Sequence, residues 1–273
     1  MVVSSWRTRE AQALTADNLE ALFRNEIPAI RIPSFATPAE CGAFADGLRQ
    51  CDLHVVKGAT DHSSPSFEAQ KIAFIGLTQY EFKYRPIEDY LDAADTARAE
   101  VAPVFEAAFD PVERLMACLR DITDTRVEIA GDPGGRRYSA TIIRSSNEGL
   151  ALHADFAPYQ APQLTVTECV AQLAWNFYAE VPESAGGHTI VHNSPWTWER
   201  SCDGEIAENY PLSYAEVEGA ETFTFSPCEG EIVMFNSRNP HEVIPVVDAK
   251  GKDRIAMATF IGRMPDGELR LWS

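Results

Sequence analysis

A series of short β-strand patterns, with no helical pattern between them, fills the second half of this 273-residue chain. Each segment is rich in Val, Ile, Thr and aromatic residues, and turn-forming stretches such as SSNEG and PESAGG separate one from the next. Consecutive short strands of this kind predict a sandwich, a barrel or a jelly roll. The segments are, in order, RVEIA, RYSATIIR, LALHADF, CVAQLAWNFYAEV, HTIVH, ETFTF, EIVMF, EVIPVV, RIAMATFIG and ELRLW.

Residues 1–125 differ from this pattern, because apolar residues recur there mainly at helical spacing. One helix start is well marked, since Thr37 and Glu40 form the pattern of a capping box. A helix break is expected near Asp110-Pro111. Helices are predicted over 16–26, from 37 onward and over 96–123, and a short strand is predicted over 28–33.

The chain contains no internal repeat and no low-complexity linker, so we predict one domain over residues 1–273. Its fold class is mainly β with helical support (α+β). Residues 1–125 form the helical support and the substrate-side elements, and residues 126–273 form the β core. The polar, turn-rich segment 58–66 is a candidate mobile loop, and a lid over a site is one role for it.

Composition limits the partners of the chain. Its net charge of −18 argues against a nucleic-acid surface and against an anionic membrane. No apolar run reaches the ~18 residues of a membrane span, and the N-terminus lacks the apolar core of a signal peptide. The six cysteines are scattered without a CxxC pair, which is typical of free thiols in the cytoplasm. We expect a cytoplasmic protein with a small-molecule substrate, and the sequence leaves a homodimer open.

Two histidines and an aspartate form the strongest candidate site. His153 and Asp155 occupy positions i and i+2 of a predicted strand, so their side chains share a face, with Cα atoms about 7 Å apart. His241 opens a later strand after a loop, where a rigid scaffold can present a ligand. Two histidines and a carboxylate form the facial triad of non-heme Fe(II) oxygenases, with zinc as the main competitor. His188 and His192 would lie about 13 Å apart on one strand, so they are interpreted as structural.

Arg254 is a second candidate, because it begins an otherwise apolar strand thirteen residues after His241. An arginine in such a position is costly to bury unless it has an anionic partner. Its planar fork of N–H groups suits a carboxylate held through two hydrogen bonds. The alternative is an arginine at the mouth of the strand that reaches solvent.

Taken in order, these residues resemble the Fe(II)/2-oxoglutarate-dependent oxygenase family over roughly residues 137–262. The pattern is His153-x-Asp155, then PESAGGHTIV, then P-x-x-G-x-x-x-x-F from Pro227 to Phe235, then His241-x-Val-x-Pro-Val, then Arg254. The resemblance implies a double-stranded β-helix, which is a distorted jelly roll. It implies that His153, Asp155 and His241 are catalytic and bind Fe(II). It also implies that Arg254 pairs with the distal carboxylate of 2-oxoglutarate, with O₂ as co-substrate.

Several segments are similar to one branch of that family. They are RRYSATIIRSSNEGLALHADF, QLAWNFY and GGHTIVHN. This branch contains hydroxylases of free or N-substituted amino acids and carrier-independent halogenases of amino acids, nucleotides and alkaloids. The halogenases have Gly where this chain has Asp155, so the resemblance implies hydroxylation here. Many members have Ser two residues after the arginine, and Ala256 in that place leaves the second anchor of the distal carboxylate unassigned.

Strand pairing suggests further residues of the pocket. The strands RYSATIIR and LALHADF flank a turn, and we predict that they form a hairpin. Directly opposite residues share a face, which would turn Ser139, Thr141 and Arg137 toward the metal, with Thr141 beside the cofactor. A one-residue slip in the register would reverse this arrangement. In the next strand, Gln172 and Asn176 would line the cavity.

Cationic side chains are candidates for binding a substrate carboxylate. They are Lys83, Arg85, Arg137 and Arg144, with Arg263 as a weaker candidate, and the alternative for each is the more common solvated surface charge. The preferred function is hydroxylation of an unactivated C–H of an amino acid or an amino-acid derivative. The alternatives are a hydroxylase of a nucleotide or an alkaloid-type compound, an oxidation that ends in desaturation or ring closure, a zinc-dependent jelly-roll hydrolase, and a non-catalytic binding protein.

Overall fold

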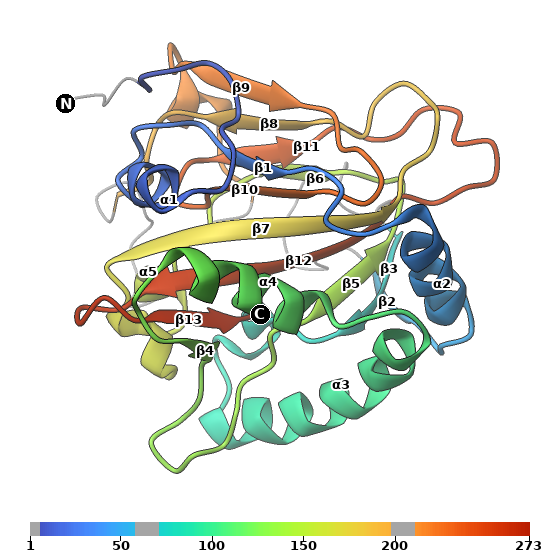
Figure 1. The fold of residues 1–273 in the computed structure, drawn as a ribbon, viewed down its shortest axis with the longest axis horizontal. Helices are drawn as coiled ribbons and strands as arrows, with labels where there is room; N and C mark the ends of the chain where they lie inside the picture. The colour runs from blue at the N-terminus through green and yellow to red at the C-terminus, as the bar shows by residue number, and fades with distance from the viewer. Residues whose placement is uncertain (1–5, 58–70, 198–210) are drawn as a thin grey trace.

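The computed structural model describes residues 6–57, 71–197 and 211–273, which form two β-sheets flanked by helices (Figure 1). The predicted loop 58–66 lies outside these ranges. Among the described helices, none is long and apolar enough to cross a membrane. The helices are α1 (Ala16–Phe23), α2 (Pro38–Arg49), α3 (Ile87–Ala107), α4 (Pro111–Ile122) and α5 (Ala157–Gln160), and the 3-10 turns are η1 (Gln79–Phe82), η2 (Thr165–Glu168) and η4 (Tyr214–Val217).

A nine-stranded sheet in the described part of the chain forms the larger wall of the protein. Its pairs are antiparallel, except that β4 runs parallel to β13. The main path is β1 (Ile30–Ile32), β10 (Ile232–Asn236), β7 (Ala171–Glu180), β12 (Ile255–Arg263), β5 (Ile142–Ser145), β3 (Lys71–Gly76) and β2 (His54–Lys57), with β13 (Leu269–Trp272) beside β12 and β4 (Val127–Ile129) beside β13.

A four-stranded antiparallel sheet forms the smaller wall. Its order is β6 (Leu150–His153), β11 (His241–Val243), β8 (Thr189–His192) and β9 (Thr222–Phe225). From β5 to β12 the chain passes back and forth between the two sheets, so that β5, β7, β10 and β12 lie in the larger and β6, β8, β9 and β11 in the smaller. This winding is the double-stranded β-helix that the strand pattern and the family resemblance predicted.

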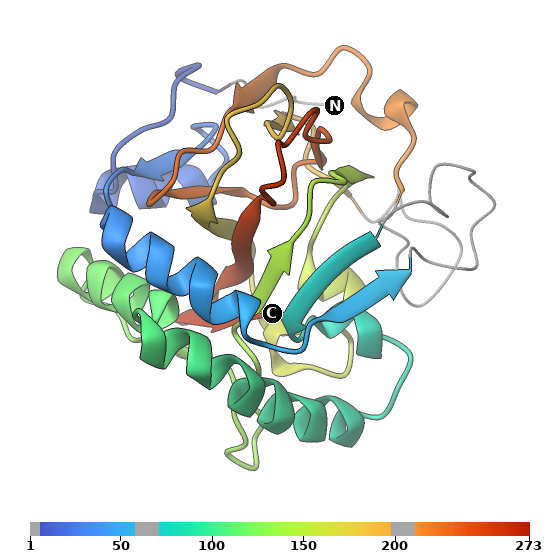
Figure 2. The same ribbon diagram turned by 90° about the vertical axis from the view of Figure 1, so that its right-hand side faces the viewer.

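The larger sheet presents two chemically different faces, because successive side chains of a strand point to opposite sides. In β7, Leu173, Trp175 and Phe177 are fully buried in a core that also contains Leu22 of α1 and Phe44 of α2. Figure 2 shows these helices, together with α3 and α4, on one side of the larger sheet. The opposite face is left to line the space between the two sheets, which is where a site can form.

The predicted helix starts at residues 16 and 37 are confirmed within one residue, whereas the helix predicted from residue 96 begins earlier, at Ile87. The Thr15 side chain accepts a hydrogen bond from the Asn18 backbone N–H at 3.2 Å and caps α1. At α2 the capping box is complete, since Thr37 Oγ1 accepts from the Glu40 N–H and Glu40 Oε2 accepts from the Thr37 N–H. The predicted break separates α3 from α4, which begins at Pro111.

Two expectations about the strands are wrong. The predicted hairpin does not form, because β5 pairs with β3 and β12 in the larger sheet while β6 pairs with β11 in the smaller. The segment SSNEG is therefore a crossing between sheets and not a tight turn. Residues 54–57 and 71–76 of the N-terminal part also form strands, and they extend the larger sheet beyond β5.

Replacing Phe177 with alanine is expected to lower the free energy of unfolding by about 3–5 kcal/mol, the usual cost of removing a fully buried aromatic ring. Phe177 is 0 % exposed and makes edge contacts with Phe44 and Phe109, both at 5.4 Å between ring centroids. Denaturant unfolding followed by circular dichroism measures the change. Val170→Ala is the control, because Val170 is 59 % exposed and should change stability by less than about 0.5 kcal/mol. A cost below about 1 kcal/mol for Phe177→Ala would contradict the packing described.

Candidate active site

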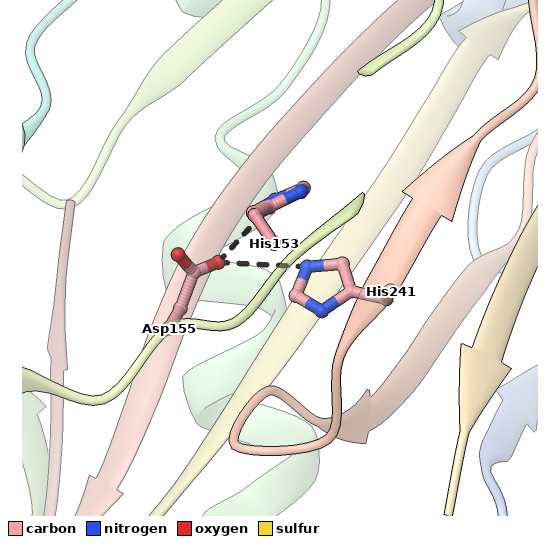
Figure 3. A group of neighbouring side chains, drawn as sticks. All are labelled: His153, Asp155 and His241. Carbon is pink, nitrogen blue, oxygen red and sulfur yellow. Dashed lines mark ion pairs between the residues drawn. The ribbon is translucent and has the colours of Figure 1, made fainter. Parts of the chain in front are cut away.

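His153, Asp155 and His241 come together at one end of the smaller sheet. His153 is the last residue of β6 and His241 the first of β11, and these two residues are paired directly across the strands. One ligand atom from each of the three lies within 4.8 Å of the others. Asp155 Oδ2 is 3.8 Å from His153 Nε2 and 3.5 Å from His241 Nε2 (Figure 3). The three side chains thus converge on one point, as chelation of one ion requires.

Backbone carbonyls fix the orientation of both imidazole rings. His153 Nδ1 lies 2.7 Å from the carbonyl oxygen of Ala151, and His241 Nδ1 lies 2.9 Å from that of Asn239. A carbonyl oxygen only accepts, so each Nδ1 carries the proton and each Nε2 keeps its lone pair. Histidines that bind a metal through Nε2 ordinarily make this kind of hydrogen bond from Nδ1 to a carbonyl or carboxylate oxygen.

The electrostatics of the group favour the protonation states that bind metals. Burial and the neighbouring His241 lower the pKa of His153 to about 4, so this imidazole is neutral at pH 7. Burial raises the pKa of Asp155, but the two histidines outweigh it, and the pKa lies below its usual value. A neutral imidazole and an ionised carboxylate are the ligating forms of these groups.

The loop that carries Asp155 is tied to the strand connection before β11. The Asp155 N–H donates to the Ser237 carbonyl at 2.8 Å, and the Ser237 hydroxyl donates to the Asp155 carbonyl at 2.9 Å. Further along, the Asn239 side chain donates to Asn25 Oδ1 at 2.7 Å, and both side chains are buried. These contacts hold Asp155 and the approach to His241 in one fixed arrangement.

A cavity of about 400 Å³ opens between the two sheets beside this group. The smaller sheet contributes His153, Thr189 and His241, and Asp155 follows β6. The larger sheet contributes mainly inward-facing residues of β5, β7, β10 and β12, namely Ile142, Arg144, Ala174, Asn176, Phe235, Arg254, Ala256, Ala258 and Phe260. An apolar pocket with a few convergent polar groups is the ordinary form of a small-molecule site.

Arg254 enters the same cavity from the residue before β12. Its guanidinium carbon lies 5.1 Å from the ring centroid of Tyr178. Its Nε is buried and has no hydrogen-bond partner among the described residues. Ala256 also lines the cavity and supplies no hydroxyl, whereas the Thr189 side chain on β8 brings a hydroxyl to the cavity from the opposite sheet. An orphaned guanidinium N–H facing a cavity is suited to a carboxylate.

The other predicted residues are divided between the cavity and positions outside it. Asn176 lines the cavity as predicted, and Leu173, Trp175 and Phe177 pack on the far face of the sheet. Gln172 is buried beyond the cavity, where its Oε1 accepts from the Ala157 N–H at 2.8 Å.

Ser139, Thr141, Arg137 and Arg85 are absent from the cavity lining. Ser139 and Thr141 were predicted to face the site because of the expected hairpin. In the structure the alternate positions, Ile142 and Arg144, point into the cavity from β5 instead. Arg137 is exposed on another surface. Arg85 is exposed and pairs with Asp89 at 3.0 Å. Of the predicted cations, Lys83 and Arg144 do line the cavity.

Tyr80 and Thr189 are cavity residues that the sequence interpretation did not identify. Tyr80 follows β3, and its hydroxyl donates to Gln160 Oε1 at 3.2 Å. Burial and the charge of Asp155 raise the pKa of Tyr80 well above its usual value, so its hydroxyl stays protonated. The alternation in KIAFIG could have indicated β3, but no local pattern indicates that β3 lies beside β5.

A double-stranded β-helix that carries this His–Asp–His group and an arginine in one cavity defines the 2-oxoglutarate-dependent non-heme iron oxygenases. Comparison with protein families agrees with this class. The chain belongs to the family described as carrier-protein-independent halogenase WelO5, whose model matches residues 9–272.

Two relatives and one solved structure are similar to the chain. The L-gamma-glutamyl-L-propargylglycine hydroxylase of Streptantibioticus cattleyicolor is 29% identical over 271 residues, covering 97% of this chain and 95% of that protein. The leucinostatins biosynthesis cluster protein S of Purpureocillium lilacinum is 29% identical over 198 residues, covering 71% and 80%. An N-substituted L-amino acid dioxygenase from Burkholderia ambifaria AMMD shares the fold, with a TM-score of 0.58, 16% identity and coverage of 94% and 91%.

Proposed function

We propose that this protein is a dioxygenase that uses Fe(II) and 2-oxoglutarate to hydroxylate an unactivated C–H of a small amino-acid derivative. The observation that carries the proposal is the Asp155 carboxylate, which lies between the two histidine Nε2 atoms and faces the cavity that contains Arg254. A member of this family with a carboxylate at that position has the complete facial triad of a hydroxylase.

The donor set fits iron. His153, Asp155 and His241 would hold Fe(II) on one side and leave the cavity side open for other ligands. The carbonyls of Ala151 and Asn239 keep both Nε2 lone pairs available. When bound, Fe(II) with 2-oxoglutarate supplies the oxidation in which 2-oxoglutarate and O₂ become succinate and CO₂ and the substrate carbon gains a hydroxyl.

The arginine fits 2-oxoglutarate. Arg254 would bind its distal carboxylate, since the buried Nε lacks a partner among the described residues and the side chain faces the cavity. Thr189 is our candidate for the second anchor of that carboxylate, in place of the hydroxyl that Ala256 lacks. Phe235, Ala256 and Phe260 supply apolar walls that exclude water around the bound molecules.

The kind of substrate is supported by the relatives. One related protein is named as a hydroxylase of an amino-acid derivative, and the structural neighbour as a dioxygenase of N-substituted amino acids. A cavity of about 400 Å³ has the size of small-molecule sites. We propose that Asn176 adds a polar contact to such a substrate, because its side chain lines the wall beside Ala174.

We also propose that the chain works as one domain on a small molecule, without nucleic acid, in the cytoplasm. The five described cysteines are free thiols, which supports a reducing compartment. The net charge of −18 supports the exclusion of nucleic acid.

Visible absorption under anaerobic conditions tests the function. Adding Fe(II) and then 2-oxoglutarate to the purified protein is expected to produce a weak charge-transfer band that needs both additions. In Arg254→Ala, the 2-oxoglutarate concentration that gives half of the maximal absorbance should rise about 30-fold, because removing one partner of a buried charge pair costs at least 2 kcal/mol. The band should still appear at high 2-oxoglutarate, since the metal ligands are intact.

Arg263→Ala is the matched control on the same strand. Arg263 pairs with Glu20 outside the cavity, so the 2-oxoglutarate requirement should stay at the wild-type value. A second arm measures succinate release with a panel of amino acids and their N-acyl derivatives, where one class should stimulate turnover. Absence of the band, with tight zinc binding in its place, would reject the oxygenase function and favour hydrolysis.

A further inference from the structure

Arg144 is a cation of the cavity that the proposed iron and 2-oxoglutarate sites do not use. It lies on β5, where its backbone pairs with Ala256 of the neighbouring strand. Strand alternation turns Arg144 and Ile142 to the inner side of the sheet, and both line the cavity with the metal-binding group. The side chain is therefore built into the wall that faces the site.

The guanidinium group of Arg144 makes no hydrogen bond or ion pair with any residue in 6–57, 71–197 or 211–273. Burial lowers the pKa of Arg144. The negative charges of Asp155 and Glu81 act in the opposite direction, although neither carboxylate forms an ion pair with the guanidinium group. By contrast, the half-buried Arg136 pairs with Asp92 at 2.8 Å. A partly buried guanidinium without a counter-ion is costly, and a ligand with a planar anionic group would offset that cost.

The charges in the cavity indicate what the ligand must carry. Fe(II), the two carboxylates of 2-oxoglutarate, Asp155 and Arg254 together sum to zero. The positive charge of Arg144 is not balanced within this sum, and Glu81, whose charge acts on Arg144, does not line the cavity. Among the described lining residues, Asp155 is the one acidic side chain, and it is a proposed metal ligand. The described part of the lining therefore leaves the charge of Arg144 for one more anion, and it offers no carboxylate other than Asp155 for an ammonium group.

We propose that Arg144 binds a carboxylate of the organic substrate, and that the substrate is a net anion whose amine is blocked, as in an N-acyl amino acid. This inference rests on the proposed function of the same cavity. The fork of Arg144 would hold the carboxylate through two hydrogen bonds. The apolar side chains of Leu150, Phe235 and Val243 would take the aliphatic part of the molecule.

Three matched probes test the charge requirement: N-acetyl-L-leucine is an anion, N-acetyl-L-leucinamide is neutral, and L-leucine is a zwitterion. Each is titrated calorimetrically into the anaerobic Fe(II)–2-oxoglutarate complex, so that the readout is binding and not turnover. Wild-type protein should bind the anion at least about tenfold more tightly than either of the others.

Arg144→Gln should weaken binding of the anion by about 30-fold and leave that of the neutral amide unchanged. Arg144→Lys should recover part of the loss, because a positive charge returns without the fork. Arg136→Gln is the matched control, since this arginine pairs with Asp92 and Asp95 outside the cavity. Thermal unfolding of each variant identifies any general loss of structure.

Three results would overturn the inference. In the first, the wild type binds none of the anionic probe or prefers the zwitterion. In the second, Arg144→Gln binds the anion as tightly as the wild type. In the third, Arg144→Gln raises the 2-oxoglutarate requirement of the absorption band and leaves the substrate affinity unchanged, which would assign Arg144 to 2-oxoglutarate. Failure of the proposed function is distinct from all three, since it appears as absence of the band in the wild type.

Discussion

Replacing His241 with alanine is expected to abolish the Fe(II)–2-oxoglutarate absorption band and substrate-dependent succinate release. His241 is 5 % exposed, and its Nε2 lies 3.5 Å from Asp155 Oδ2. Alanine leaves one imidazole and one carboxylate, which is too few ligands to hold the ion firmly. Loss of a group that merely orients a metal ligand already costs 10–100-fold in metal affinity, so loss of the ligand should cost more than about 100-fold. Anaerobic titration with Fe(II) measures this change.

His192→Asn is the matched control for that variant. His192 is also a buried histidine of the smaller sheet, but its Nε2 faces Glu242 Oε1 at 3.4 Å and it does not line the cavity. This variant should bind Fe(II) with the wild-type affinity and give the same band. If His241→Ala retained the band while folding normally, the three-residue site would be refuted.

Replacing Asp155 with glycine is expected to reduce hydroxylation by more than about 100-fold and to make Fe(II) binding depend on chloride. The change removes the one negative ligand of the group and opens a position beside the two histidines. A small anion can then occupy that position and restore the charge. The apparent Kd for Fe(II) should therefore fall as chloride replaces a non-coordinating anion at constant ionic strength.

Asp155→Glu separates charge from geometry in that experiment. It keeps a carboxylate, so its iron affinity should not respond to chloride, although the longer side chain should still lower the hydroxylation rate. The wild type should show no chloride response either. Full hydroxylation by Asp155→Gly would exclude Asp155 as a ligand.

The fold was predictable from the sequence where the chemistry is local. The Thr37 capping box follows from its hydrogen-bonding side chains, and the strands around Trp175 and Met257 follow from runs of strand-forming residues between turns; both signals lie within a few residues. Strand partners were not predictable in the same way. Nothing in SSNEG distinguishes a turn that closes a hairpin from a segment that crosses to another sheet, because pairing depends on strands about 90 residues away for β6 and about 110 residues away for β5.

The candidate site was also only partly predictable from the sequence. His153, Asp155, His241 and Arg254 were found because each stands at a fixed place in a family pattern, and the structure brings their side chains to one cavity. Residues inferred from the hairpin, such as Thr141, were not brought there. The alternation rule also fails in β6, where the register against β11 shifts and Leu150 and His153 both face the cavity.

The two walls of the cavity carry different polar groups. The three metal-binding side chains belong to β6, its following loop and β11, whereas Arg144, Asn176 and Arg254 project from β5, β7 and the start of β12 across the gap. The cationic and amide groups that select the organic molecule can therefore change without altering the metal ligands, because a substitution in the larger sheet leaves the backbone ladder of the smaller sheet intact. Such a scaffold can acquire new substrates without rebuilding its reactive centre.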